Sequence, residues 1–359
     1  MKKKKKLVIV GGGFAGLAVA KHILKIAPKE FEVVLVDKNN YHLFTPAFFR
    51  ATSSILDVSK VFQVVAIKFE DIFGNKKITF LKNKVVKFLP NQNKINLKNK
   101  KVVDYDYLVL ATGAEPQFPN SSFSSLEDVL RIKTKIEEIL KQKAKKEKID
   151  IVVAGAGLVG CELIASLHHY VRNLSVAHSH PRDLIHFKLF EIGSKILPSS
   201  SSWIRETALN IFEKMNVEIF TKSQIEKEDL EDVLVWATGK KQNHLIEEFK
   251  ETSSTLRLKK YKNVFLIKAP TAQSAIHQGK YIARALKKKI NNQKISNYKE
   301  NKSFYIVDFG GNDIFIDFGF LKLKGLFAKF LRHLIFFRYF RNVLGLKKTI
   351  KWLKLYRNL

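Results

Sequence analysis

The stretch from residue 7 to residue 37, LVIVGGGFAGLAVAKHILKIAPKEFEVVLVD, decides the fold. It begins with an apolar, β-branched run at residues 7–10, of the kind that fills a parallel strand buried on both faces. Glycines follow, then a helix is expected from residue 14, and residues 31–36 form a second apolar run. The order of strand, glycine turn, helix and strand predicts a βαβ unit.

The glycines of this stretch have the spacing G-x-G-x-x-G. Gly11 allows a tight turn, Gly13 lets backbone approach a pyrophosphate, and Gly16 lets the helix pack closely on the strand. Asp37 ends the second strand, where a carboxylate accepts hydrogen bonds from an adenosine ribose. Because all these parts occur in order, the stretch predicts a dinucleotide site rather than a glycine-rich turn in a generic α/β protein.

The same pattern returns in the second half of the chain. Residues 149–154 read as a strand, and a strand at residues 187–190 ends at an acid, Glu191. Between them the glycine spacing is repeated by Gly155, Gly157 and Gly160. In addition, residues 106–113 (DYLVLATG) match residues 232–239 (DVLVWATG) position for position. Two copies of one nucleotide-binding unit, the second inserted into the first, explain this agreement, so two dinucleotides are expected.

The acid of the second copy bears on cofactor choice. Glu191 would repel a 2′-phosphate, for which an arginine is the usual partner, so this site is expected to prefer NAD over NADP. Lys195 follows closely and would tolerate extra phosphate charge, which leaves NADP open.

Net charge is the outlier of the composition. The 359 residues include 64 basic and 33 acidic side chains, a net charge of +31, whereas the apolar content of 46% is ordinary for a globular protein. Such a field attracts polyanions, so anionic lipid headgroups and nucleic acid are the two candidate partners. Cys161 is the only cysteine, which excludes an intrachain disulfide and favours a reducing compartment.

The sequence predicts neither a signal peptide, nor a membrane-spanning helix, nor a metal site. Residues 1–20 have the basic head and apolar segment of a signal peptide, but the glycine motif argues against one, and the chain is expected to stay in the cytosol. No run approaches the roughly 20 apolar residues that a membrane-spanning helix requires. The histidines near Pro181, namely His178, His180 and His186, lack a carboxylate or cysteine frame at metal-site spacing, so no metal is predicted.

The segments between and after the two copies give weaker predictions. Residues 39–46 are expected to form a loop that reaches back over a bound nucleotide, and residues 62–110 alternate as a small antiparallel layer would.

The tail predicts two basic amphipathic helices separated by Gly345. One face of the first helix is expected to hold Phe336, Phe337, Phe340, Val343 and Leu344, with Arg338, Arg341 and Asn342 opposite. The second is expected to place Leu346, Ile350 and Leu353 opposite Lys347, Lys351 and Lys354, with Trp352 and Tyr356 at the margin. Such helices lie in the headgroup plane of an anionic leaflet, and the alternative is docking on the protein's own core.

These motifs together resemble the flavoprotein pyridine-nucleotide oxidoreductases, and among them the type II NADH:quinone oxidoreductases. The resemblance rests on residues 8–16 (VIVGGGFAG), 36–46 (VDKNNYHLFTP), 157–163 (GLVGCEL) and 272–279 (AQSAIHQG), and it spans nearly the whole chain.

The resemblance implies the positions of both cofactors. FAD would contact Gly11, Gly13, Phe14, Ala15, Gly16, Asp37, Lys38, Pro46, Thr112, Gly113 and Lys268. NADH would contact Gly155, Gly157, Gly160, Glu191 and Gly239. At residues 267–268 the sequence is Ile-Lys, where the family has a Gly-Asp whose carboxylate binds a ribityl hydroxyl. Lys268 would donate to that hydroxyl or reach a phosphate.

Three catalytic residues are implied in the same way. Glu162 matches a family glutamate linked to proton handling near flavin and nicotinamide, although the dipole at the start of a helix would alone favour an acid there. Gln273 and Gln278 match the pair on the quinone side of the flavin. Their other interpretation is as ordinary polar residues of a helix at 271–286.

The expected fold class is therefore α/β, with two nested Rossmann-like dinucleotide-binding domains and a basic amphipathic C-terminal helical tail. An FAD domain is expected at residues 1–118 and 240–300, an NAD domain at 119–239 and a membrane-attachment region at 301–359. The expected protein is a peripheral, non-proton-pumping NADH dehydrogenase on the cytoplasmic face of the inner membrane. Its partners would be a quinone and an anionic membrane surface but no nucleic acid, and homodimer formation stays open.

Three rival functions remain from the sequence alone. They are an NADH-dependent flavin reductase with another acceptor, a flavin-poor and non-catalytic membrane relative, and a flavoprotein that binds nucleic acid through its positive charge.

Overall fold

The computed structural model describes residues 3–74, 78–118, 121–143, 147–178, 181–225, 232–249, 251–301 and 304–357. The chain divides into two compact units. The first comprises Met1–Leu43, Ala66–Glu115 and Lys241–Ser303, and the second Phe44–Val65, Pro116–Lys240 and Phe304–Leu359. These two units are defined by contacts within the chain. The predicted domains were defined by the cofactor that each would bind, so their boundaries stay a prediction. Residue 119, one of them, lies outside the described residues.

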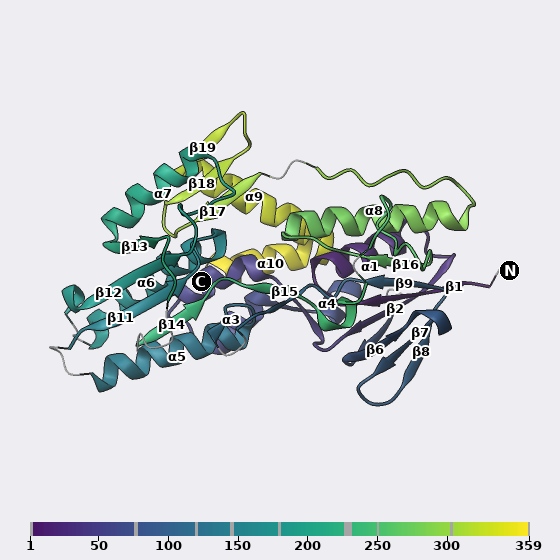
Figure 1. Ribbon diagram of the computed structural model, residues 1–359, viewed down its shortest axis with the longest axis horizontal. Coiled ribbons are helices and arrows are strands. Elements are labelled where there is room, and N and C mark those ends of the chain that lie inside the picture. The colour runs from purple at the N-terminus through teal and green to yellow at the C-terminus, as the bar shows by residue number, and fades with distance from the viewer. Residues whose placement is uncertain are drawn as a thin grey trace. The chain divides into compact units, whose positions relative to one another are not determined.

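A parallel sheet forms the centre of the first unit. Its strand order is β16-β9-β1-β2-β5. The strands are β1 (Lys5–Val10), β2 (Phe31–Asp37), β5 (Thr79–Lys82), β9 (Tyr107–Leu110) and β16 (Val264–Leu266). The helices α1 (Phe14–Ile26) and α8 (Ala272–Ile290) run alongside each other (Figure 1). Their close approach depends on Gly279, where an added Cβ would lie 2.5 Å from the carbonyl oxygen of Ala15.

Smaller elements complete this unit. An antiparallel layer is made of β6 (Val85–Leu89), β7 (Lys94–Leu97) and β8 (Val102–Asp104). A hairpin pairs β3 (Tyr41–Leu43) with β4 (Ala66–Lys68), followed by α4 (Phe69–Phe73), and the 3₁₀ turns are η2 (Pro90–Gln92) and η5 (His244–Ile246). Two short strands, β10 (Ala114–Pro116) and β15 (Lys240–Gln242), lie where the chain passes between units.

The second unit repeats the parallel sheet with order β13-β12-β11-β14. Its strands are β11 (Ile149–Ala154), β12 (Ile185–Glu191), β13 (Val217–Thr221) and β14 (Val233–Trp236). The associated helices are α5 (Leu126–Gln142), α6 (Leu158–His178) and α7 (Ser202–Lys214), with the 3₁₀ turn η4 (Arg182–Leu184). An antiparallel sheet of β17 (Tyr305–Asp308), β18 (Ile314–Asp317) and β19 (Lys322–Lys324) follows.

The end of the chain also belongs to the second unit. The helices α9 (Gly325–Leu344) and α10 (Leu346–Arg357) are separated at Gly345, which has a φ of +81°. Helix α10 packs on α3 (Val58–Val65), and Arg50 of α2 (Phe48–Ser53), which follows η1 (Thr45–Ala47), lies over the ring of Tyr356 in α10. The ring of Phe44 lies 4.7 Å from that of Phe340 and 5.5 Å from that of Trp352, measured between centroids.

Two predictions about the first half of the chain need correction. Residues 39–46 are not all loop, because they include β3 and the start of η1. The antiparallel layer within residues 62–110 is confirmed only at residues 85–104, since residues 58–65 and 69–73 are helical. Residues 58–65 have valines at helical spacing, with Val61, Val64 and Val65 buried, and this period was missed.

The membrane face predicted for the first tail helix is also wrong, whereas Leu346 and Ile350 of the face predicted for the second helix are exposed. Phe336, Phe340 and Val343 are buried within the second unit, as are Trp352 and Tyr356. Other exposed apolar side chains of this region lie before Phe336 in the sequence, and they are Phe320, Leu321, Leu326, Phe327, Phe330 and Leu334. Within the described ranges, no helix combines the length and apolarity needed to cross a bilayer.

Candidate dinucleotide-binding sites

The glycine turn of the first unit has the geometry that its sequence predicts. Gly11 has a φ of +101°, and an added Cβ there would lie 2.3 Å from the carbonyl oxygen of Ala111. An added Cβ on Gly16 would lie 1.8 Å from the carbonyl oxygen of Gly11, so neither position accommodates a side chain. Gly13 differs, because nothing lies within 4 Å of its added Cβ. Gly13 also caps α1 without a side-chain hydrogen bond, which leaves backbone donors for an anion.

Asp37 holds this turn from the end of β2. Its carboxylate accepts hydrogen bonds from the backbone N–H of Gly12 at 2.6 Å and of Asn39 at 2.8 Å. Burial raises the pKa of Asp37, and these two hydrogen bonds together with Lys38 oppose that rise. A carboxylate in this place has lone pairs left for the hydroxyls of a ribose.

The second unit has a glycine turn of the same kind, which is also held by an acid. Gly155 has a φ of +103°, and an added Cβ on Gly160 would lie 1.7 Å from the carbonyl oxygen of Gly155, whereas Gly157 faces open space. The carboxylate of Glu191 accepts hydrogen bonds from Ala156 N and Gly193 N, both at 2.8 Å.

The acids at the start of the matching strands agree as well. Asp106 Oδ2 accepts from Lys6 N at 2.7 Å in the first unit, and Asp232 Oδ2 accepts from Asp150 N at 2.9 Å in the second. The duplicated sequence pattern is therefore a duplicated structure.

Other predicted flavin residues gather at the carboxyl edge of the first sheet. Thr112 and Gly113 follow β9, and Ile267 and Lys268 follow β16, with Ile267 N donating to Leu110 O at 3.0 Å. Nothing lies within 4 Å of an added Cβ on Gly113, and Thr112 Oγ1 is buried without a hydrogen-bond partner. An open backbone beside an unsatisfied buried hydroxyl fits a polar ligand at this edge.

The remaining predicted residues are more scattered. Phe14 begins α1 and makes an edge contact with His42, at 4.8 Å between ring centroids, and Ala15 is buried. Lys38 is exposed beside Asp37. Pro46 belongs to the second compact unit. Gly239, with a φ of +72°, ends the second copy, and its carbonyl accepts from Gln117 N at 2.6 Å.

Of the two glutamines, only Gln278 is buried. Its side-chain amide donates to Lys268 O at 3.1 Å and accepts from Lys268 N at 3.2 Å, so it clamps the segment that departs from the family pattern. Gln273 is exposed in the first turn of α8, whose N-cap is Thr271.

Glu162 lies in α6 just after the first turn of that helix and is buried. Its Oε1 accepts from the backbone N–H of Asp308 at 2.8 Å. Burial raises the pKa of Glu162 to about 8, and the charge of Asp308 adds to the rise, whereas the hydrogen bond from Asp308 and the charge of Arg332 oppose it. Its carboxyl is thus suited to take up or release a proton near neutral pH.

Sequence reasoning missed several groups around these sites. His42 is fully buried with Nδ1 3.2 Å from Gly12 O, and burial lowers its pKa to about 4. Phe69 packs against the other side of the turn, since an added Cβ on Gly12 would lie 2.2 Å from its ring. Arg332 was also missed, although it is a single charge in the apolar stripe of Ala328, Phe336 and Phe340. A lone charge in such a stripe indicates a buried partner.

No metal site was predicted at the histidines near Pro181, and the structure describes only part of this segment. His180 lies outside the described residues. Among those that the structure covers, no three side chains of histidine, cysteine, aspartate or glutamate gather as metal ligands would.

Two glycine cradles in one chain, each fixed by an acid at the end of its second strand, define an oxidoreductase fold for two dinucleotides. The chain belongs to the pyridine nucleotide-disulphide oxidoreductase family, whose model matches residues 5–257.

Relatives and solved structures agree with this assignment. The type II NADH:quinone oxidoreductase of Staphylococcus haemolyticus is 24% identical, and that of Staphylococcus aureus 25% identical, each over 86% of this chain and 89% of the relative. NDH2 from Plasmodium falciparum in complex with NADH has a TM-score of 0.84 at 19% identity, covering 99% of this chain and 98% of that one. The sulfide:quinone oxidoreductase from Aquifex aeolicus has a TM-score of 0.75 at 15% identity, covering 99% and 96%. The solved structures share the fold.

Proposed function

We propose that this chain is a non-proton-pumping, FAD-dependent NADH:quinone oxidoreductase. The observation that carries the proposal is the pair of cradles in a chain that aligns with type II NADH:quinone oxidoreductases over 86% of its length and 89% of theirs. The single cysteine excludes a two-cysteine redox centre within the chain, so the disulfide chemistry of other family members is not available.

The first cradle suits FAD. The open space at Gly13 and the free backbone donors of α1 would receive the pyrophosphate, and Asp37 would accept from the adenosine ribose. The buried hydroxyl of Thr112 and the open backbone at Gly113 would meet the ring end. Lys268 would serve as a donor where the family has a carboxylate, and Gln278 would hold its backbone in place.

The second cradle suits NADH. Gly155, Gly157 and Gly160 would hold its pyrophosphate, with Gly239 nearby in the repeat, and Glu191 would accept from its ribose. An ionised Glu191 would disfavour the 2′-phosphate of NADPH.

Bound FAD supplies the redox chemistry, since it accepts two electrons with a hydride and passes two electrons on. The chain would supply proton management through Glu162, whose pKa of about 8 allows both protonation states near neutral pH. Gln273, which is exposed, would offer its amide to a quinone carbonyl, and Gln278 would act through the Lys268 segment.

A visible absorption spectrum tests this function directly. The purified protein is expected to be yellow, NADH should bleach the flavin band, and a short-chain quinone should restore it. A colourless protein that cannot be reconstituted with FAD would leave only the non-catalytic rival. Flavin that NADH reduces but only another acceptor reoxidises would support the flavin reductase.

We further propose that the protein attaches to an anionic membrane surface at the cytoplasmic face of the inner membrane. The support is the exposed apolar side of α9, where Phe327 is 78% and Phe330 is 70% exposed, next to Lys322, Lys324 and Lys329. Each lysine near such a surface contributes about 1 kcal/mol.

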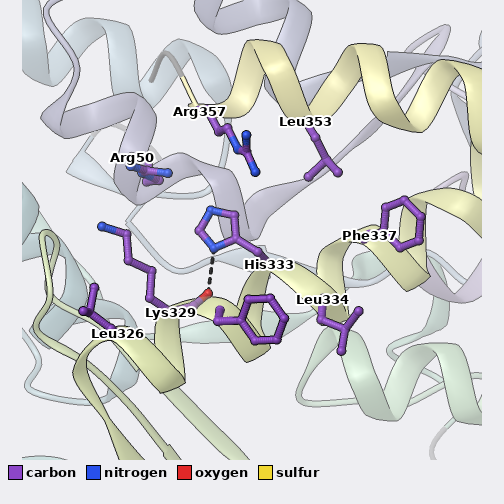
Figure 2. A pocket seen from close by; sticks show the side chains of 9 residues that line it. Arg50, Leu326, Lys329, His333, Leu334, Phe337, Leu353 and Arg357 are labelled. Carbon is purple, nitrogen blue, oxygen red and sulfur yellow. Dashed lines mark hydrogen bonds between the residues drawn. The ribbon is translucent and has the colours of Figure 1, made fainter.

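A groove beside this surface belongs to the same region (Figure 2). Its volume is about 570 Å³, and its apolar walls include Leu334 and Phe337 of α9 and Leu353 of α10. Arg50, Lys329 and Arg357 give it a basic rim. Apolar walls with a basic rim suit an acyl chain below an anionic headgroup.

Vesicle sedimentation tests the attachment. The protein should bind vesicles that contain anionic lipid more strongly than neutral ones, and Phe327→Glu with Phe330→Glu should release it. Leu209→Glu, the same change at an exposed position of α7, is the control that should stay bound. Equal vesicle binding by the double variant and the control would contradict membrane attachment through the exposed apolar side of α9.

A further inference from the structure

Four buried polar groups in the second unit form a continuous chain. Asp308 N donates to Glu162 Oε1 at 2.8 Å, and Arg332 Nη1 lies 2.6 Å from Asp308 Oδ2. Arg332 Nη2 donates in turn to the hydroxyl of Tyr356. The four residues come from α6, β17, α9 and α10, so the chain leads from the predicted proton carrier to both C-terminal helices.

The ion pair in this chain is almost fully enclosed. The side chain of Arg332 is 4% exposed and that of Asp308 is 9% exposed. The second carboxylate oxygen of Asp308 accepts from Gly310 N at 2.9 Å. The Arg332 guanidinium lies 5.0 Å from the centroid of the Phe336 ring, so aromatic carbon covers it. Because burying two charges costs about as much as their attraction returns, stability alone does not explain this pair.

The charged and titratable groups around Glu162 come from several elements. Asp308 and Arg332 act on it with opposite signs. The Cys161 thiol is its neighbour on α6, and burial raises the pKa of that thiol. Beyond Arg332, Tyr356 of α10 lies under the Arg50 guanidinium of α2, at 5.0 Å from its ring centroid. Asp308 donates its backbone N–H to the Glu162 carboxyl, and the Asp308 carboxylate is held by Arg332.

We propose that Asp308 and Arg332 are positioning residues that set the charge state of Glu162, so that helix α9 is coupled to the carboxyl that handles protons. This rests on the proposed function only in giving Glu162 its task. The negative charge of Asp308 disfavours ionised Glu162, and the positive charge of Arg332 favours it. The two charges therefore oppose each other in setting how readily Glu162 ionises near neutral pH. The balance depends on where α9 lies, because α9 carries only the positive member.

Opposite substitutions separate this role from a structural one. Arg332→Gln removes the positive charge and should raise the pH at which the Glu162 carboxyl is half protonated, its midpoint, by roughly one unit. Asp308→Asn removes the negative charge and should lower this midpoint by roughly one unit. The double variant removes both charges and should return close to the wild-type midpoint. Arg332→Lys keeps the charge and should stay there too.

The midpoint is best read by infrared difference spectroscopy of the full-length protein across pH. The band of the protonated carboxyl is assigned by its loss in Glu162→Gln. Lys214→Gln, which removes an exposed positive charge from α7, is the control and should leave the midpoint unchanged. The pH profile of kcat for quinone reduction should then move with the infrared midpoint in each variant.

Shifts of the two single variants in the same direction, or a double variant that keeps either single shift, would overturn the proposal. Removing one partner of a buried pair is strongly destabilising, so Arg332→Gln is the variant most prone to fail in folding. In that case the other two variants decide. A lower midpoint in Asp308→Asn that returns to the wild-type value in the double variant supports the proposal, and an unchanged midpoint in Asp308→Asn contradicts it. The infrared titration needs neither NADH nor quinone, so its outcome is separate from a failure of quinone reduction by the wild-type protein.

Discussion

Replacing Glu162 by glutamine should change how the stability of the protein depends on pH. Burial raises the pKa of Glu162 from 4.5 to about 8. Between these two values the folded protein holds a proton that the unfolded chain has released. Stability contributed by this group is therefore full at low pH and falls as pH rises, until the carboxyl ionises near pH 8.

The size of the effect follows from linkage. One proton bound only in the folded state gives a slope of about 1.4 kcal/mol per pH unit. From pH 5.5 to pH 7.5 the wild type should thus lose about 2.7 kcal/mol relative to Glu162→Gln, which does not titrate. Glutamine keeps an oxygen that accepts from Asp308 N, so the geometry is retained.

Urea denaturation at several pH values measures this difference. Groups distant from Glu162 titrate equally in both proteins, so the difference between the two free energies of unfolding isolates the effect of Glu162. Glu206→Gln, the same change at an exposed position of α7, is the matched control and should show no such slope. If the difference between wild type and Glu162→Gln is constant from pH 5.5 to pH 7.5, the raised pKa and the proton role built on it are refuted.

Three further predictions follow from the cradles and the tail. Gly16→Ala places a Cβ 1.8 Å from Gly11 O and should lower the free energy of unfolding by about 1–3 kcal/mol in thermal or urea denaturation. Gly13→Ala should keep the wild-type stability but lose FAD absorbance, because its Cβ enters the open space proposed for the pyrophosphate. Equal effects of the two variants would contradict FAD binding at this turn. Glu191→Gln should reduce the preference for NADH over NADPH in kcat/KM by about tenfold, and an unchanged ratio would remove Glu191 from cofactor choice. Trp352→Ala should lower the free energy of unfolding by about 3–5 kcal/mol, because it leaves a cavity where the buried indole ring was. It also removes the hydrogen bond that Trp352 Nε1 donates to Val64 O at 2.9 Å. A loss below about 1 kcal/mol would show that the tail adds little to the stability of this core.

The parts of the fold that the sequence predicted well are those with local signals. Strand runs, glycine spacing and terminal acids each follow from conformational freedom or packing within about 30 residues, which is why the strands, glycine turns and helices of both units were predicted correctly. Helix α3 was missed because its apolar residues fit both a strand and a helix in a short window.

The tail shows what a sequence cannot give. Its helices and the break at Gly345 were predicted correctly, but amphipathic spacing does not say whether the apolar face meets lipid or protein. Phe336 and Phe340 pack on Phe44, a contact across almost the whole sequence. The partners of Glu162 have the same origin, since Asp308 and Arg332 reach it only through the tertiary structure.

The bond from Trp352 to Val64 joins residues 288 positions apart and has a consequence for synthesis of the protein. The second unit takes its first segment from Phe44–Val65 and its last from Phe304–Leu359, so residues 44–65 must wait until residues 304–357 have been synthesised before that core can close. Until then Phe44 and its neighbours have no aromatic partners from the tail, and the nascent chain presents apolar surface to the cell. The core of this unit therefore closes late in synthesis, because its first segment must wait for its last.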